Sequence, residues 1–150
     1  MKKNILKLNV VVLLLTTTFF SSCRYLDDGA TISVPGCNEK AVLDNVKFPQ
    51  VATENYVITN VVLNNDCLEI TLNSSGCDPD NWDMNLIGVR SLAAVYPPEV
   101  NTKIELQNKE ACLAVFQKTV SFDVTPYRIP GQNQVRININ GWNTGILYQY

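Results

Sequence analysis

The sequence predicts an all-β protein: an antiparallel β-sandwich of about 7–8 strands, preceded by a signal peptide and a short tether. Two observations indicate this fold. Short runs of alternating apolar and polar residues recur from residue 56 to residue 150. Turn-forming residues separate these runs, which is typical of sandwiches built from many short strands. A stretch of about 100 residues is long enough to bury a hydrophobic core, so we expect a single domain there.

The first two runs predict a β-hairpin. Residues 56–63 and 67–73 flank the sequence Asn64-Asn65-Asp66, which is a hairpin turn signal. In the second run every second residue is leucine or isoleucine, and this period of two predicts one buried face.

Five further runs complete the predicted sandwich. The alternation resumes in residues 82–86, 103–107, 120–125, 135–139 and 146–150. Only residues 108–118 contain enough helix-favouring side chains to be argued as a helix.

The amino terminus has the layout of a secretory signal peptide. Three lysines within the first seven residues precede an unbroken apolar stretch at residues 10–15, and Ser21-Ser22 stands directly before Cys23. The apolar stretch is shorter than the about 20 residues that a membrane-spanning helix needs. We therefore expect a signal peptide at residues 1–22, a lipidated tether at residues 23–50 and the sandwich at residues 51–150.

The segment Phe20-Ser21-Ser22-Cys23 resembles the lipobox of bacterial lipoproteins, in the form common in Bacteroidota-type lipoproteins. The resemblance implies that Cys23 is acylated and anchors the chain to the outer membrane, on its periplasmic face or at the cell surface. Two or three acyl chains hold a protein at a membrane effectively permanently. The alternative is an ordinary signal peptide with Cys23 free or paired. In the resembling lipoproteins, acidic residues such as Asp27-Asp28 act as a signal for surface exposure; otherwise they belong to a solvated tether.

The remaining cysteines predict two disulfides. An even number in an exported chain is typical of a disulfide framework, and four cysteines allow three connectivities. Of these we favour Cys37 with Cys67 and Cys77 with Cys112. Zinc is the competing use, but the chain has no C-x-x-C pair and no histidine.

Charge and histidine content exclude several functions. Twelve basic and fourteen acidic residues give a net charge of −2, and loss of the three N-terminal lysines leaves nine against fourteen, or −5. This balance argues against nucleic-acid binding, and only the lipid is expected to hold the protein at an anionic membrane. Without histidine, Ser-His-Asp and Cys-His catalysis are absent.

Residues 56–150 resemble a family of uncharacterised small Bacteroidota lipoproteins. The family carries a strand ending in Gly-Gly-Cys, a later lone cysteine and a Phe-Asp-Leu strand, which are matched here by Ser75-Gly76-Cys77, Cys112 and Phe122-Asp123-Val124. A histidine of the family falls at Asp80 in this chain. The resemblance implies a β-sandwich lipoprotein and supplies no activity to inherit.

Two groups of residues are candidate binding sites. Asp78, Asp80 and Asp83 are hard oxygen ligands that suit Ca²⁺, although their spacing is not that of an EF-hand and a solvated turn explains the same residues. The aromatic and amide residues near the C-terminus suit a ligand surface for sugars, but an aromatic residue in a turn also packs onto a sheet. This second group comprises Trp142, Asn138, Asn140 and Asn143.

The sequence therefore predicts a lipid-anchored cell-envelope protein of unknown molecular activity, which binds or structurally supports another envelope component. The alternative is a glycan-binding accessory lipoprotein. A small hydrolase with paired carboxylates ranks third, because the carboxylates are scattered and sequence spacing cannot pair them. We expect no enzyme and no cofactor other than the calcium alternative.

Overall fold

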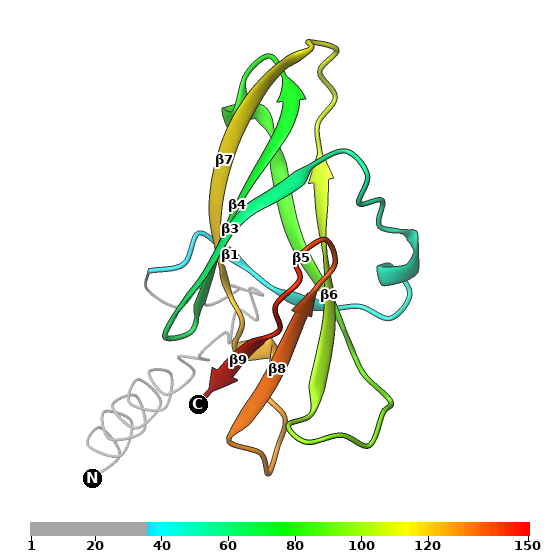
Figure 1. Cartoon of the computed structure of the whole chain (residues 1–150), viewed down its shortest axis with the longest axis vertical. Coiled ribbons are helices and arrows are strands. Elements are labelled where there is room, and N and C mark those ends of the chain that lie inside the picture. Colours follow the sequence, from blue (N-terminus) through cyan, green and yellow to red (C-terminus); the bar gives the residue numbers. More distant parts are fainter. Residues whose placement is uncertain (1–35) are drawn as a thin grey trace, which may run out of the picture. The chain divides into compact units, whose positions relative to one another are not determined.

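The computed structural model describes residues 36–150, which form two β-sheets (Figure 1). The four-stranded sheet has the order β1 (Glu39–Lys40), β7 (Ala114–Asp123), β4 (Cys67–Gly76) and β3 (Val57–Asn64). The five-stranded sheet has the order β2 (Val42–Leu43), β5 (Asp83–Arg90), β6 (Glu99–Gln107), β8 (Gln134–Ile139) and β9 (Ile146–Gln149). Three short 3-10 helices are η1 (Phe48–Gln50), η2 (Pro79–Asn81) and η3 (Thr125–Tyr127). The expected signal peptide, its cleavage site and Cys23 lie outside residues 36–150.

The core lies between the two sheets. Inward-facing residues of β4 and β7 share one hydrophobic cluster with those of β5, β6 and β8, so the sheets pack face to face as a sandwich. The predicted alternation in β4 is confirmed, because Leu68, Ile70 and Leu72 are all fully buried. Within residues 36–150, no helix has the length and apolar character required to cross a membrane.

All seven alternating runs are strands in the structure. The first two form the antiparallel β3–β4 hairpin, and Asn65 in its turn adopts a φ of 53°. Asparagine tolerates this left-handed conformation better than most residues, which explains its use there.

The predicted all-β sandwich is confirmed, but its sheets are mixed rather than antiparallel throughout. β1 is parallel to β7, β2 is parallel to β5, and β6 is parallel to β8. The parallel β6–β8 pair arises because the chain visits the other sheet as β7 between these two strands. Residues 39–43 cross from one sheet to the other, and they add one short parallel edge strand to each sheet.

The predicted tether boundary at residue 50 is too late. Glu39–Lys40 pairs with β7 and Val42–Leu43 pairs with β5, while Ala41 between them is buried in the core. This segment therefore belongs to the sandwich, and it raises the strand number within residues 36–150 to nine.

Residues 108–118 are not a helix. Residues 108–113 form a loop, and the remainder begins β7, whose ten residues pair with the ten residues of β4. Helix propensity is a weak preference, and pairing along a whole neighbouring strand overrides it.

Two disulfides crosslink the sandwich, in the pairing that the sequence favoured. Cys37 is bonded to Cys67 with a Cα–Cα distance of 5.5 Å, and Cys77 is bonded to Cys112 with a Cα–Cα distance of 5.1 Å. The first joins the segment before β1 to β4, and the second joins the end of β4 to the loop before β7.

Candidate functional site

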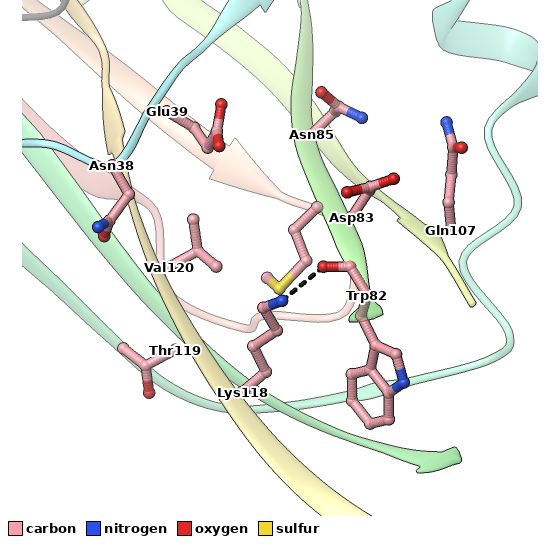
Figure 2. Close-up of a pocket in the computed structure, with 10 residues that line it drawn as sticks. Asn38, Glu39, Trp82, Asp83, Asn85, Gln107, Lys118, Thr119 and Val120 are labelled. Carbon is pink, nitrogen blue, oxygen red and sulfur yellow. Dashed lines mark hydrogen bonds between the residues drawn. The ribbon is translucent and has the colours of Figure 1, made fainter. Parts of the chain in front are cut away.

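A cleft of about 500 Å³ opens at one side of the sandwich, between β7 of one sheet and β5 of the other (Figure 2). Its walls come from β1, β5, the end of β6 and β7. The lining residues are Asn38, Glu39, Trp82, Asp83, Met84, Asn85, Gln107, Lys118, Thr119 and Val120.

The cleft exists because β1 and β2 are too short to cover the strands beside them. β1 pairs only with Phe122 and Asp123 of β7, and β2 pairs only with Ile87 and Gly88 of β5. Among the residues that the structure describes, no further strand covers the rest of these two edges. The two uncovered edges border the same cleft.

Lys118 crosses the base of the cleft. It occupies an inward-facing position of β7, two residues before the buried Val120. Its ammonium group donates a hydrogen bond to the main-chain oxygen of Pro79 at 2.7 Å. It also donates to the main-chain oxygen of Trp82, and Figure 2 shows this second bond. The sequence analysis missed Lys118. This lysine lies two residues before Val120, in register with the apolar face of the strand, and a charged residue at such a position is a signal that could have identified it.

Trp82 forms one wall of the cleft and is held from behind by Glu110. The indole is 2% exposed, and its N–H donates to Glu110 Oε2 at 3.0 Å. The same carboxylate accepts hydrogen bonds from the backbone N–H groups of Cys77 and Asp78. Hydrogen bonds from the Asp78 and Cys77 backbones, followed by the Trp82 indole, lower the pKa of Glu110 to about 2.

The accessible charges of the cleft are negative. Glu39 and Asp83 are both exposed and line the cleft, from β1 and β5 respectively (Figure 2). The ammonium group of Lys118 donates to two carbonyl oxygens and, within residues 36–150, forms no ion pair with either carboxylate. A positively charged group would therefore find complementary charge here.

The three aspartates proposed for calcium do not converge. Asp78 caps η2 by accepting the backbone N–H of Asp80, whereas Asp83 is the first residue of β5 and faces the cleft. Within residues 36–150, no group of three or more histidine, cysteine or acidic side chains is arranged to hold a metal ion. The turn interpretation of this segment is the one that the structure supports.

The proposed C-terminal ligand surface is also divided. Trp142 is half-buried and packs against the core, whereas Asn140 and Asn143 are exposed. Asn138 donates to Asn101 Oδ1 at 3.3 Å and, together with Asn140, lines a separate hollow of about 360 Å³ beside Phe48. Trp142 and Asn143 do not line this hollow.

Within residues 36–150, every carboxylate with a shifted pKa has a pKa below its ordinary value. Hydrogen bonds lower the pKa of Asp66, in the first place from Tyr148. For Glu105, burial opposes the shift, and hydrogen bonds from Lys47 and Gln107 lower the pKa. These shifts, like that of Glu110, are the opposite of the raised pKa that a general acid in glycoside hydrolysis requires.

Three solved structures are similar to this chain at low sequence identity. A protein of unknown function, DUF1344, from Bacteroides vulgatus has a TM-score of 0.51 at 12% identity, over 75% of this chain and 56% of its own. A NigD-like immunity protein from Bacteroides caccae has a TM-score of 0.49 at 12% identity, over 72% and 57% of the two chains. A protein described as toxin-related, from Parabacteroides distasonis, has a TM-score of 0.48 at 13% identity, over 75% and 60%.

The likeness to the first of these structures shows the fold alone, and the sheets of this chain define its class as all-β with two mixed sheets. This chain spans less than two thirds of the length of each of the three structures. No protein-family model and no curated protein matches the sequence.

Proposed function

We propose that this protein is exported, is anchored by lipid on Cys23 to the outer membrane, and binds another envelope component through the cleft between β5 and β7. The observation that carries the export and the anchor is the cysteine pairing. Cys37, Cys67, Cys77 and Cys112 pair with one another, which leaves Cys23 without a partner in its own chain.

The disulfides support export. Disulfides persist in oxidising compartments such as the periplasm and the cell surface, and are rare in the cytosol. The basic, apolar and small segments before Cys23 supply a matching export signal. An unpaired cysteine directly after this signal is the residue that the lipobox resemblance assigns to acylation.

Membrane fractionation tests the anchor. The wild-type protein should remain in the membrane fraction and incorporate radiolabelled palmitate, whereas Cys23→Ala should do neither. The double variant Asp27→Ala/Asp28→Ala is the matched control: it keeps Cys23, so it should retain the label and the membrane attachment. Unchanged retention of Cys23→Ala in the membrane would contradict the anchor. If the acidic pair directs surface exposure, the control should also lose accessibility to protease added to whole cells.

The proposed role is binding rather than catalysis. The cleft combines a wall of buried tryptophan with exposed amide and carboxylate groups, and concave sites with a few convergent polar groups are the usual binding sites of proteins. A photo-crosslinking residue at Gln107, which is exposed and lines the cleft, tests this role in cells. It should capture a defined envelope component, and the same residue at Val62, on β3, should not. Equal capture from both positions, or none, would contradict a binding role for the cleft.

The glycan-binding alternative now rests on a different group of residues. Asn101, Asn138 and Asn140 bring amide groups to the hollow beside Phe48, which suits hydrogen bonding to sugar hydroxyls. Intrinsic fluorescence titration of the mature protein against a glycan panel tests this alternative. If it holds, Asn138→Ala/Asn140→Ala should abolish a response that Asn143→Ala retains; no response from the wild-type protein would exclude it.

A further inference from the structure

We infer that the partner is a polypeptide, which adds an extended strand to the open edge of β7 and places a basic side chain in the cleft that Glu39 and Asp83 line. This inference rests on the proposed binding role of the cleft and specifies the chemistry of the occupant.

The backbone of β7 determines which groups face the open edge. At Ser121, the backbone N–H donates to Asn38 Oδ1 and the carbonyl accepts from the Asn38 N–H, so Ser121 faces this edge. Because the direction of backbone groups alternates along a strand, Val115, Gln117 and Thr119 face the same way. Within residues 36–150, these three have no hydrogen-bond partner on that side. Such a row of unpaired N–H and C=O groups is a template for another extended backbone.

The described chain itself does not extend along this edge. Asn38 is the first residue beside β7, and Cys37 before it is bonded to Cys67 of β4. Since β4 lies on the opposite side of β7 from β1, the disulfide directs the chain away from the edge. The edge from Val115 to Thr119 is therefore left uncovered by residues 36–37.

The cleft defines which side chain the added strand would carry. Side chains alternate across an added strand, so every second one faces the cleft beside β7. There they meet Glu39 and Asp83, and neither of these forms an ion pair within the part of the chain that the structure describes. Lys118 occupies the deeper position with its own carbonyl partners. Charge complementarity thus favours a lysine or arginine in the occupant over a glutamate.

Fluorescence anisotropy with a labelled peptide tests the inference directly. The probe is acetyl-Thr-Val-Thr-Lys-Thr-Val-Thr-amide, compared with the same peptide carrying glutamate in place of lysine. The protein is the mature lipidated chain in detergent. The lysine peptide should bind at least tenfold more tightly than the glutamate peptide. Equal binding of the two peptides, or no binding of either, would overturn the inference.

Two substitutions at one position test the backbone pairing. Gln117→Pro removes the outward N–H and leaves the ladder with β4 intact, so it should weaken binding of the lysine peptide at least tenfold. Gln117→Ala removes the same side chain and keeps the N–H, so it should bind within about twofold of wild type. Similar affinities for the two variants would overturn strand addition.

A charge-reversal variant provides a second test of the inference, which does not depend on whether the Gln117→Pro protein folds. Glu39→Lys/Asp83→Lys should bind the glutamate peptide more tightly than the lysine peptide, and an unchanged preference for lysine would overturn the placement of the basic side chain. The crosslink from Gln107 separates the two proposals. If Gln107 captures a partner equally well in the Gln117→Pro background, the strand-addition inference fails while the binding role of the cleft stands; if Gln107 captures nothing, the binding role fails.

Discussion

The indole N–H of Trp82 donates a hydrogen bond to the carboxylate of Glu110, which lies 28 residues away in the sequence. The contact ties the loop before β7 to the wall of the cleft, next to the Cys77–Cys112 disulfide. Glu110 therefore positions Trp82 without facing the cleft itself, and its ionisation has a consequence for stability.

Stability should fall in acid partly through Glu110. The pKa of this carboxyl is lowered from its ordinary value of 4.5 to about 2, so its contribution is complete above about pH 4.5 and is lost as the pH falls through about 2. Urea unfolding at a series of pH values should show a shallower decline for Glu110→Gln than for wild type in this window. Some loss of stability in acid should remain in Glu110→Gln, because the pKa values of Asp66 and Glu105 are also lowered. Parallel curves for the two proteins would contradict the role of Glu110.

Gly88→Ala should destabilise the sandwich. A Cβ added at residue 88 would lie 2.8 Å from Cε1 of the fully buried Tyr127, whose hydroxyl donates to the Leu86 carbonyl at 3.2 Å. Overpacking of this kind costs about 1–3 kcal/mol. A double-mutant cycle with Tyr127→Leu isolates the contact, because the cost of Gly88→Ala should shrink once the ring is gone. An equal loss of stability on Gly88→Ala in the wild-type and Tyr127→Leu proteins would show that the Tyr127 ring is not the reason for glycine at this position.

Tyr148→Phe should destabilise the C-terminal strand by about 1 kcal/mol. The Tyr148 hydroxyl donates to Asp66 Oδ1 at 2.6 Å and accepts from Arg128 Nε at 2.8 Å, so it joins the β3–β4 turn to the segment before β8. Burial, followed by the hydrogen bond to Asp66, raises the pKa of this phenol well above its ordinary value. Thermal unfolding of Tyr148→Phe measures the effect, with the exposed Tyr96→Phe as a control that should leave Tm unchanged. An equal Tm for both variants would contradict the network.

The disulfides should account for every thiol except that of Cys23. In a Cys23→Ala background, a thiol-reactive dye should label no cysteine of the unfolded protein before reduction and four afterwards. Removal of one bridge, as in Cys77→Ser/Cys112→Ser, should lower the free energy of unfolding by about 3–4 kcal/mol. Labelling before reduction would show that the bridges do not form.

The sequence predicted the strands that are long enough to show a period. The alternation in β4 and β8 repeats over several residues and depends only on which face meets the core, so it can be read locally. β1 and β2 have two residues each, too few to show a period, so the sequence alone places them in the tether. The parallel pairings depend on which strands become neighbours after the chain changes sheets, and local alternation carries no information about this.

The cleft could not be predicted from the sequence for a related reason. It is formed by segments around Glu39, Trp82 and Lys118 that are distant in the chain and meet only through the sheet pairings. The sequence instead predicts sites from residues that are close together in the chain. Asp83 is the one of them that lines the cleft, together with Glu39 rather than with Asp78 or Asp80.

The mass of the mature N-terminus tests the central claim most directly. Intact-mass spectrometry of the protein isolated from membranes, together with fragmentation of its N-terminal peptide, should show that residues 1–22 are missing and that Cys23 carries acyl groups. A full-length chain that begins at Met1, with an unmodified Cys23, would contradict the proposal that this protein is a lipid-anchored module of the cell envelope.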